Sequence, residues 1–225
     1  MQIGLLEAGH AAEIIRAEHG DYRDMFTRIL EPHGLSFRAW DVEGMQFPES
    51  VHDAEGWLIS GSRHGVYEDH PFIPPLEEFI RAAYDAGIPL VGICFGHQIV
   101  AQALGGRVEK FAGGWSVGST AYTIEGRPIT LNAWHQDQVL IPPETAQTVG
   151  CSPFCAHAAL IYNDRILTLQ PHPEFDRGII ADMIAHRGSG IVPDPILVDA
   201  TARLDRPTDG PDMAARIARF FKERR

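Results

Sequence analysis

One cysteine of this sequence lies in a setting that favours nucleophilic chemistry. Cys94 stands between Gly92 and Gly96, where a short apolar run gives way to a segment with helical spacing. A sharp strand-to-helix turn exposes a nucleophile at its tip, and glycines two positions away leave room for the strained backbone. The amide groups and the dipole at the start of the next helix favour thiolate over thiol. Cys94 is therefore our candidate nucleophile, although a buried, inert cysteine remains the alternative when the motif is taken alone.

A candidate base and its partner lie much further along the chain. His172 and Glu174 are two residues apart, so an extended backbone projects them to the same side. Pro171 and Pro173 stiffen the segment by fixing their own φ angles. A carboxylate beside the imidazole would orient it and stabilise it after it takes the thiol proton. Taken singly, a loop histidine and an acid at a helix start are equally good interpretations; together with Cys94 they predict a Cys-His-Glu triad.

Strands and helices alternate in the first half of the chain and must position these residues. Apolar runs predict strands at residues 2–6, 35–40, 56–60 and 89–93. Helical spacing predicts helices at residues 22–30, from Pro75 to Gly87, and at 95–104. Such alternation implies βαβ units, and therefore an α/β fold with a mostly parallel central sheet flanked by helices on both faces.

The pattern changes between residues 107 and 168. Further strands are predicted at residues 115–124, 129–134, 156–162 and 165–169, with Asn163-Asp164 in a tight hairpin between the last two. These strands are expected to add a partly antiparallel section to the sheet. Helices follow at residues 176–186, near 195–204, and at 212–222. We expect one domain over residues 1–225, with a catalytic core at about 1–190 and a C-terminal helical extension at about 191–225.

Charge and composition exclude several classes of function. The formal net charge of −11 opposes an encounter with nucleic acid or an anionic membrane, so neither is expected as a partner. The basic residues of the terminal run 222–225 are interpreted as the polar end of a helix. No stretch approaches the ~20 apolar residues that span a bilayer, and no signal peptide is evident. The odd number of three cysteines fits a reducing compartment, so a cytoplasmic location is expected.

The sequence predicts neither a metal ion nor a cofactor. Cys151, Cys155 and His157 have a suitable spacing, but they lack the fourth ligand of a structural zinc site and are interpreted as part of a mobile loop. The glycine-rich segments match neither phosphate-binding fingerprint. Five further histidines lie beside turn residues or charges and are interpreted as solvated: His33, His52, His64, His70 and His186.

The two catalytic segments resemble the class I glutamine amidotransferase family of the triad type, whose fold is flavodoxin-like. The likeness rests on Gly-Ile-Cys-Phe-Gly-His-Gln at residues 92–98 and on Gln-Pro-His-Pro-Glu at residues 170–174. Ile-Ser-Gly-Ser at residues 59–62 resembles the family's oxyanion loop. The likeness spans roughly residues 56–175 and is closest to the amidotransferase domain of GMP synthase and its stand-alone relatives.

This resemblance implies a mechanism and a set of residues. Cys94 would attack the γ-amide of glutamine or of a γ-glutamyl compound and form a thioester, with His172 and Glu174 completing the triad. Backbone N–H groups of Gly61, Ser62 and Phe95 would form the oxyanion hole, in which one donor is typically worth about 3 kcal/mol. Substrate-binding roles are implied for Gln98, Trp115, Trp134 and His135, and for Gln98 a surface position on its helix is the alternative.

Departures from the family pattern leave the substrate open. Ser62 and Arg63 stand where relatives have a second glycine and a proline, and Trp134 and Gln136 replace small residues of a pocket segment. We expect a small-molecule γ-glutamyl substrate, with a separate synthetase subunit as a possible acceptor of ammonia. The alternatives are a γ-glutamyl peptidase or hydrolase without an acceptor, a non-catalytic regulatory protein of the same fold, and a redox or stress protein of a related fold.

Overall fold

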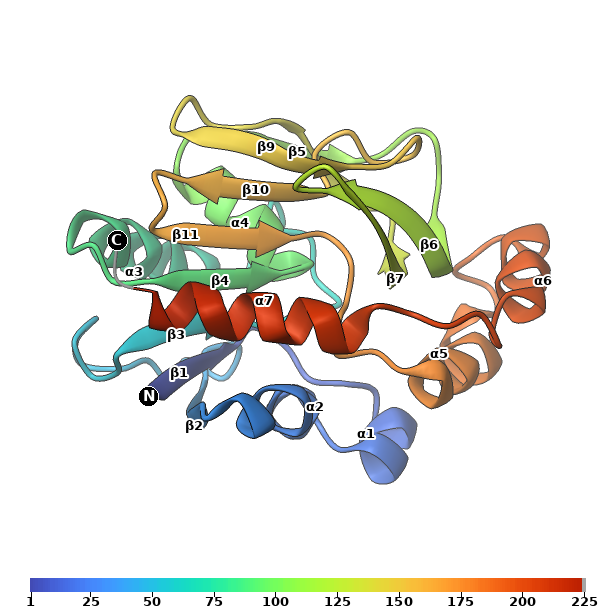
Figure 1. Cartoon of the computed structure of the whole chain (residues 1–225), viewed down its shortest axis with the longest axis horizontal. Helices are drawn as coiled ribbons and strands as arrows, with labels where there is room; N and C mark the ends of the chain where they lie inside the picture. The colour runs from blue at the N-terminus through green and yellow to red at the C-terminus, as the bar shows by residue number, and fades with distance from the viewer. Residues whose placement is uncertain (224–225) are drawn as a thin grey trace.

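A computed structural model describes residues 1–223, so the last two residues of the basic run 222–225 lie outside the described residues. The main sheet has the strand order β2-β1-β3-β4-β11-β10-β9-β6-β7 (Figure 1), and β5 pairs with β8 in a separate ribbon. The strands are β1 (Gln2–Glu7), β2 (Ser36–Asp41), β3 (Gly56–Ile59), β4 (Leu90–Ile93), β5 (Arg107–Lys110), β6 (Ser116–Ile124), β7 (Arg127–His135), β8 (Asp137–Ile141), β9 (Ala146–Cys151), β10 (Ala159–Tyr162) and β11 (Ile166–Leu169).

The main sheet is divided into two sections by strand direction. Every pairing from β2 through β1, β3 and β4 to β11 is parallel. Every pairing from β11 through β10, β9 and β6 to β7 is antiparallel. The expected α/β fold with added antiparallel strands is thereby confirmed.

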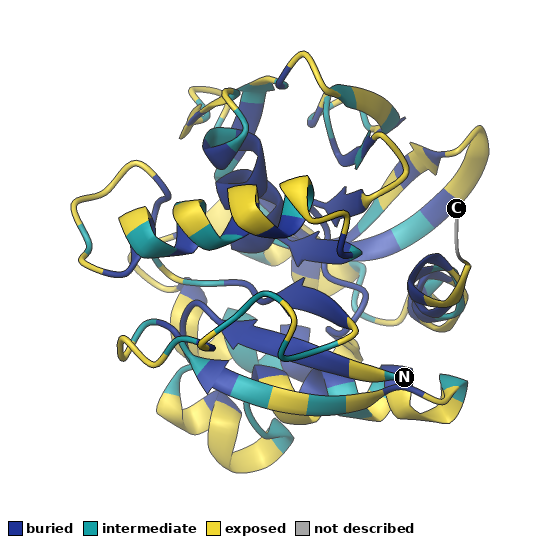
Figure 2. Cartoon of the chain, turned by 90° about the vertical axis from the view of Figure 1, so that its left-hand side faces the viewer, coloured by how far each residue is buried: buried dark blue, intermediate teal, exposed yellow. Residues whose placement is uncertain are grey.

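Helices cover both faces of the parallel section (Figure 1). One apolar cluster joins residues of β1 to α2, α5 and α7, and a second joins residues of β3 and β4 to α3 and α4. Figure 2 shows the central strands buried between helices whose outer faces are exposed. The helices are α1 (Glu13–His19), α2 (Tyr22–Leu30), α3 (Ile73–Asp85), α4 (Phe95–Ala103), α5 (Arg177–Met183), α6 (Asp194–Ala202) and α7 (Gly210–Lys222).

A tight hairpin sets the position of β11. Asn163 and Asp164 have φ angles of 47° and 58°, as the two central residues of a type I′ turn require. The hairpin predicted at these two residues is therefore confirmed. It returns the chain so that β11 runs parallel to β4, with Leu169 opposite Ile93. The segments that follow these two strands consequently leave the sheet at the same edge.

Several elements differ from the sequence-based expectation. α1, β5, β8 and β9 were not predicted, because each is short and buries few of its side chains. The helix expected at residues 176–186 ends at Met183 and continues as a π-helical segment, Ile184–Gly188. Cys151 is exposed at the end of β9, whereas Cys155 is only 1% exposed in the apolar core, so the mobile-loop interpretation of Cys155 is wrong. Among the described helices, none has both the length and the hydrophobicity to cross a bilayer.

Candidate active site

The turn between β4 and α4 holds Cys94 in a strained conformation. Its φ and ψ angles are 53° and −101°, a region that residues other than glycine rarely adopt. Its backbone N–H donates to the Leu169 carbonyl at 2.8 Å, which ties the turn to the end of β11. A Cβ on Gly92 would lie 2.4 Å from the Gly96 oxygen, and one on Gly96 would lie 2.4 Å from the Ile59 oxygen. The two glycines are thus sterically required by this turn.

His172 lies beyond the end of β11, in contact with both other members of the predicted triad. Its Nδ1 lies 2.6 Å from Glu174 Oε1, and both residues are 3% exposed. Burial opposes protonation of the imidazole, but the charges of Glu174 and Cys94, and hydrogen bonds to both, outweigh it and raise the pKa of His172 to about 10. Because Nδ1 faces Glu174, Nε2 is left for the sulfur. The structure therefore brings the three predicted side chains together.

Asn132 on β7 holds the segment that carries the histidine. The His172 backbone N–H donates to the Asn132 carbonyl, and the Asn132 side-chain amide donates to the Phe175 carbonyl, both at 2.8 Å. The Phe175 ring stacks flat on the imidazole, with ring centroids 4.0 Å apart and an interplanar angle of 1°. The orientation of the His172 ring is thus fixed both by the stacked Phe175 ring and by the contact with Glu174.

A chain of buried amides leads to the sulfur from the other side. Gln170 Nε2 donates to Cys94 Sγ at 3.6 Å, and Gln170 Oε1 accepts from Gln98 Nε2 at 3.1 Å. Gln98 Nε2 also donates to the Asp137 carbonyl at 2.9 Å. Gln98 is 3% exposed, so it is not a surface glutamine, and both hydrogens of its amide nitrogen are used within the protein. Only its Oε1 is left to accept a hydrogen bond from a ligand.

The predicted oxyanion loop follows β3 and lies against the histidine. A Cβ on Gly61 would lie 3.1 Å from His172 Cε1 and 3.1 Å from the Tyr22 hydroxyl oxygen. The Gly96 N–H donates to the Ser60 carbonyl at 3.2 Å, which joins this loop to the start of α4. The N–H of Phe95, the first residue of α4, has no carbonyl of an earlier turn to bind. The backbone groups expected to form an oxyanion hole therefore lie on adjoining segments.

Tyr22 was not identified as a functional residue from the sequence. It begins α2, where Asp21 caps the helix in a capping box. Burial raises the pKa of Tyr22 well above its usual value, and the charges of Cys94 and Glu174 raise it further. The phenol therefore stays protonated at neutral pH and can donate a hydrogen bond near Gly61.

A pocket of about 310 Å³ opens in front of these groups. Cys94, His172, Ser62 and all four predicted substrate-binding residues line it, whereas Gly61, Phe95 and Glu174 are not among its lining residues. Cations and anions both face the cavity. The charged lining residues are Arg63, Lys110, Arg187, Glu68 and Asp137.

The antiparallel section forms one wall of the pocket. The register between β6 and β7 pairs Val117 with Trp134 and Ser116 with His135, which places Trp115 near both pocket residues of β7. Burial lowers the pKa of His135 to about 3, so the ring is neutral at physiological pH. Its Nδ1 lies 3.3 Å from the Asp137 carbonyl, which can only accept, so Nδ1 carries the proton. The buried Nε2 is then an acceptor without a protein partner among the described residues.

Comparison with known proteins identifies the family. The sequence model described as "Glutamine amidotransferase class-I" matches residues 18–185. Gamma-glutamyl peptidase 4 of Arabidopsis thaliana is 31% identical over 77% of this chain and 75% of its own. GMP synthase (glutamine-hydrolyzing) of Tolumonas auensis is 31% identical over 87% of this chain and 41% of its own. A glutamine amidotransferase from Thermotoga maritima has the same fold, with a TM-score of 0.77 and 20% identity over 99% of both chains. The chain therefore belongs to the class I glutamine amidotransferase family.

Proposed function

We propose that this chain hydrolyses γ-glutamyl amides, with Cys94 as the nucleophile, His172 as the acid–base group and Glu174 as the carboxylate that orients the histidine. The observation that carries the proposal is the convergence of these three buried side chains beside a pocket that Cys94 and His172 both line. Membership of the class I glutamine amidotransferase family supports the same reaction.

The reaction follows from the positions of the groups. His172 takes the proton of the Cys94 thiol, and the sulfur attacks the γ-amide carbon of the substrate to give a tetrahedral oxyanion. Backbone N–H groups of Gly61, Ser62 and Phe95 stabilise that oxyanion. His172 returns the proton to the nitrogen as the C–N bond breaks, which releases ammonia or an amine and leaves a γ-glutamyl thioester. Water, deprotonated by His172, then cleaves the thioester to give glutamate and the free thiol.

The pocket favours a γ-glutamyl compound that carries more than ammonia on its amide. Its charges of both signs complement the carboxylate and ammonium groups of a glutamyl residue. Gln98 Oε1, which accepts no hydrogen bond from the described residues, suits that ammonium group. Apolar side chains also line the pocket and would contact the rest of an amine or peptide. These are Ile15, Met25, Trp115, Trp134, Met183 and Ile191. Several curated relatives are named gamma-glutamyl peptidases, which supports a hydrolase of this kind.

A second candidate is a subunit that supplies ammonia to a synthetase. It is favoured by the likeness to GMP synthase, of which this chain spans 41%. In that case a separate acceptor protein would bind near the pocket, and glutamine would be the preferred substrate.

The proposal also retains two expectations from the sequence. We treat the chain as one domain, because α7 of the extension at 191–225 contributes Ile217 and Phe221 to the same apolar cluster as Ile3 of β1. We also keep the cytoplasmic location, which the three unbridged cysteines support.

The decisive experiment compares wild-type protein with Cys94→Ala and with Cys151→Ala, an exposed cysteine away from the pocket. Release of glutamate is measured with glutamine, γ-glutamyl dipeptides and γ-glutamyl amines. We expect Cys94→Ala to lose at least about 10³-fold in kcat/KM, as when a catalytic nucleophile is removed, and Cys151→Ala to keep wild-type rates. Equal rates for wild type and Cys94→Ala on every substrate would refute the proposal. A preference for glutamine over the peptides would favour the ammonia-supplying alternative.

A further inference from the structure

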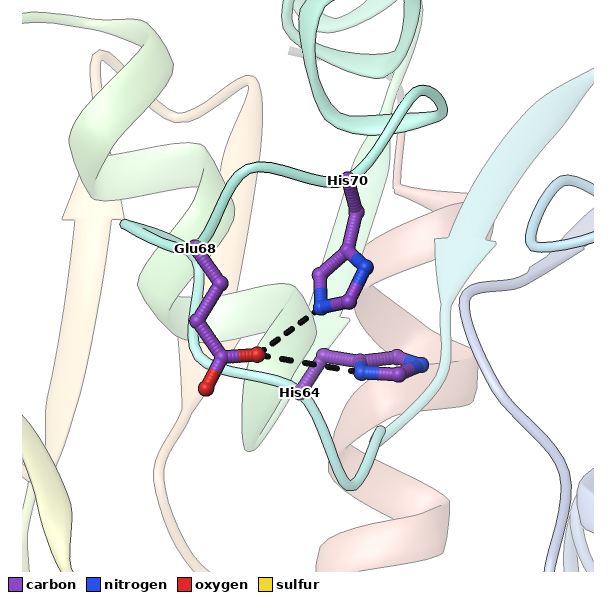
Figure 3. A group of neighbouring side chains, drawn as sticks. All are labelled: His64, Glu68 and His70. Carbon is purple, nitrogen blue, oxygen red and sulfur yellow. Dashed lines mark hydrogen bonds and ion pairs between the residues drawn. The ribbon is translucent and has the colours of Figure 1, made fainter.

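Two histidines and a glutamate converge at the rim of the pocket. His64, Glu68 and His70, which we call the rim cluster, all lie on the loop between β3 and α3 (Figure 3). Glu68 Oε2 lies 2.8 Å from His70 Nε2 and 3.8 Å from His64 Nδ1. The two imidazole rings have their centroids 4.0 Å apart. Both histidines were expected from the sequence to be solvated, which is wrong for His64, because its side chain is only 15% exposed.

We propose that the rim cluster binds one divalent metal ion such as Zn²⁺. One nitrogen or oxygen atom from each of the three residues lies within 4.8 Å of the others. Tetrahedral zinc with bonds of about 2.0–2.1 Å to nitrogen and oxygen holds its ligand atoms about 3.3 Å apart. The distances of 2.8 and 3.8 Å around Glu68 lie on either side of that value. Two imidazoles and a carboxylate are also a known zinc donor set, with a position left for water or a ligand.

A second carboxylate orients His64 in the way that metal-binding histidines require. Glu43 Oε1 lies 2.7 Å from His64 Nε2, and Arg63 donates to the same oxygen at 3.0 Å. A carboxylate at Nε2 holds the proton there, which leaves the lone pair on Nδ1, the atom that faces Glu68. Histidines that bind metals commonly donate their other N–H to a carboxylate in this arrangement. Glu43 lies outside the loop, so its contact with His64 is an observation independent of the convergence of the three ligand atoms.

A second group of residues with metal-binding side chains differs from the rim cluster in its hydrogen bonding. Glu7, His10 and Asp21 also converge, but their atoms already have protein partners. The two ring nitrogens of His10 face Asp21 at 2.8 Å and Asp41 at 3.4 Å. Asp21 Oδ1 accepts from the backbone N–H groups of Ala11 and Tyr22, and Glu7 Oε1 accepts from the Arg23 N–H. In the rim cluster, by contrast, Glu68 Oε2 is engaged by the two imidazoles of the cluster itself.

The position of the rim cluster links it to the pocket. His64 and Glu68 line the cavity, and the His64 backbone N–H donates to Ser62 Oγ at 3.2 Å. A bound ion would hold this loop, which starts at the predicted oxyanion residues Gly61 and Ser62. Its open coordination position would face the pocket and attract a carboxylate group there.

Zinc binding is tested by isothermal titration calorimetry in Cys94→Ala protein. The Cys94 substitution is needed because the thiolate and His172 could bind zinc themselves, and it also makes the test independent of catalysis. We expect one Zn²⁺ per chain with a micromolar Kd. Adding His70→Ala should raise Kd at least tenfold, and adding Glu43→Gln should raise it about tenfold, as for the loss of a group that orients a ligand. Adding His10→Ala serves as the matched control and should leave Kd within twofold.

Three outcomes would overturn the proposal: no saturable binding of Zn²⁺, an unchanged Kd with His70→Ala, or loss of binding with His10→Ala in place of His70→Ala. Thermal melting of each variant shows whether it is folded, and His70→Gln replaces His70→Ala if the latter melts early. Zn²⁺ should also raise the melting temperature of the Cys94→Ala protein, and that shift should disappear with His70→Ala.

Discussion

The parallel and antiparallel sections of the main sheet contribute different parts of the site. The parallel section ends in the Cys94 turn and in the segment of His172, where side chains are buried and hydrogen-bonded in one arrangement. The antiparallel section contributes Trp134 and His135, which face the cavity from one side. The strand ends thus position the proposed reacting groups, and the added strands form a wall of the pocket in front of them. Substitutions in the parallel section should therefore change the reaction rate, and substitutions in the antiparallel section should change the substrate preference.

Asn132 belongs to the antiparallel section but also supports the segment that carries His172. It lies on β7, in the antiparallel section, yet it binds the backbone of His172 and Phe175. The strand that forms a wall of the pocket therefore also holds the histidine, so the two sections have to assemble together.

The largest effect is expected for Glu174→Gln in the parallel section. Burial lowers the pKa of His172, and the charge of Glu174 is the largest of the influences that nevertheless raise it to about 10. The substitution should lower kcat by about 10⁴-fold, as when the carboxylate of a triad is neutralised. Because His172 would then lose its proton at lower pH, the alkaline limb of the kcat/KM profile should move down from near pH 10. If the alkaline limb of the kcat/KM profile did not move, Glu174 would not be the group that raises the pKa of His172.

Trp134→Ala tests the antiparallel section. Removing this side chain should raise KM for γ-glutamyl peptides about tenfold, the effect of a lost apolar contact, with little change in kcat. Glutamine, whose amide carries no further group, should be affected less. Steady-state kinetics on both substrates measures the difference. A fall in kcat without a change in KM would contradict the division between the sections.

Tyr22→Phe tests a group that faces the site from α2. Loss of the hydroxyl near Gly61 removes one hydrogen-bond donor, so kcat should fall by about three- to tenfold, which corresponds to the roughly 1 kcal/mol of one hydrogen bond. KM and thermal stability should stay near wild type, because the ring and its burial remain. An effect only on KM would make the hydroxyl a substrate contact.

The smallest effect is expected for His97→Asn, on stability alone. Burial lowers the pKa of His97 to about 3. Between pH 6.5 and about 3, the unfolded chain therefore binds a proton that the folded chain does not, and stability falls as pH falls. The variant should reduce this slope by about 1.4 kcal/mol per pH unit, measured by denaturant unfolding from pH 6.5 to 4.5. His52→Asn, on an exposed loop, is the control and should leave the slope unchanged.

The sequence predicted the parallel section well because its signals are local. The buried run at Leu90–Ile93, the helical spacing after it and the glycines around Cys94 each depend on neighbours in the chain. β5 was missed because only Val108 is buried in it, and α1 because it buries only Ile15. Such short elements give little periodic pattern.

Within the site, the predicted triad could be found from residue type and spacing, but its supporting groups could not. Asn132 and Gln170 act through contacts with residues far away in the sequence, and no local pattern indicates which backbone or sulfur atom they reach. The rim cluster was missed for a similar reason, because Glu43, which orients His64, lies outside the loop of the three ligand residues.

The hairpin at Asn163-Asp164 has a consequence for synthesis of the protein. β4 and its cysteine emerge from the ribosome well before β11, and the imidazole cannot approach the sulfur until β11 has been inserted between β4 and β10. With Cys94 and His172 in their proposed roles, the hydrolytic activity begins only when the last strand of the sheet has docked.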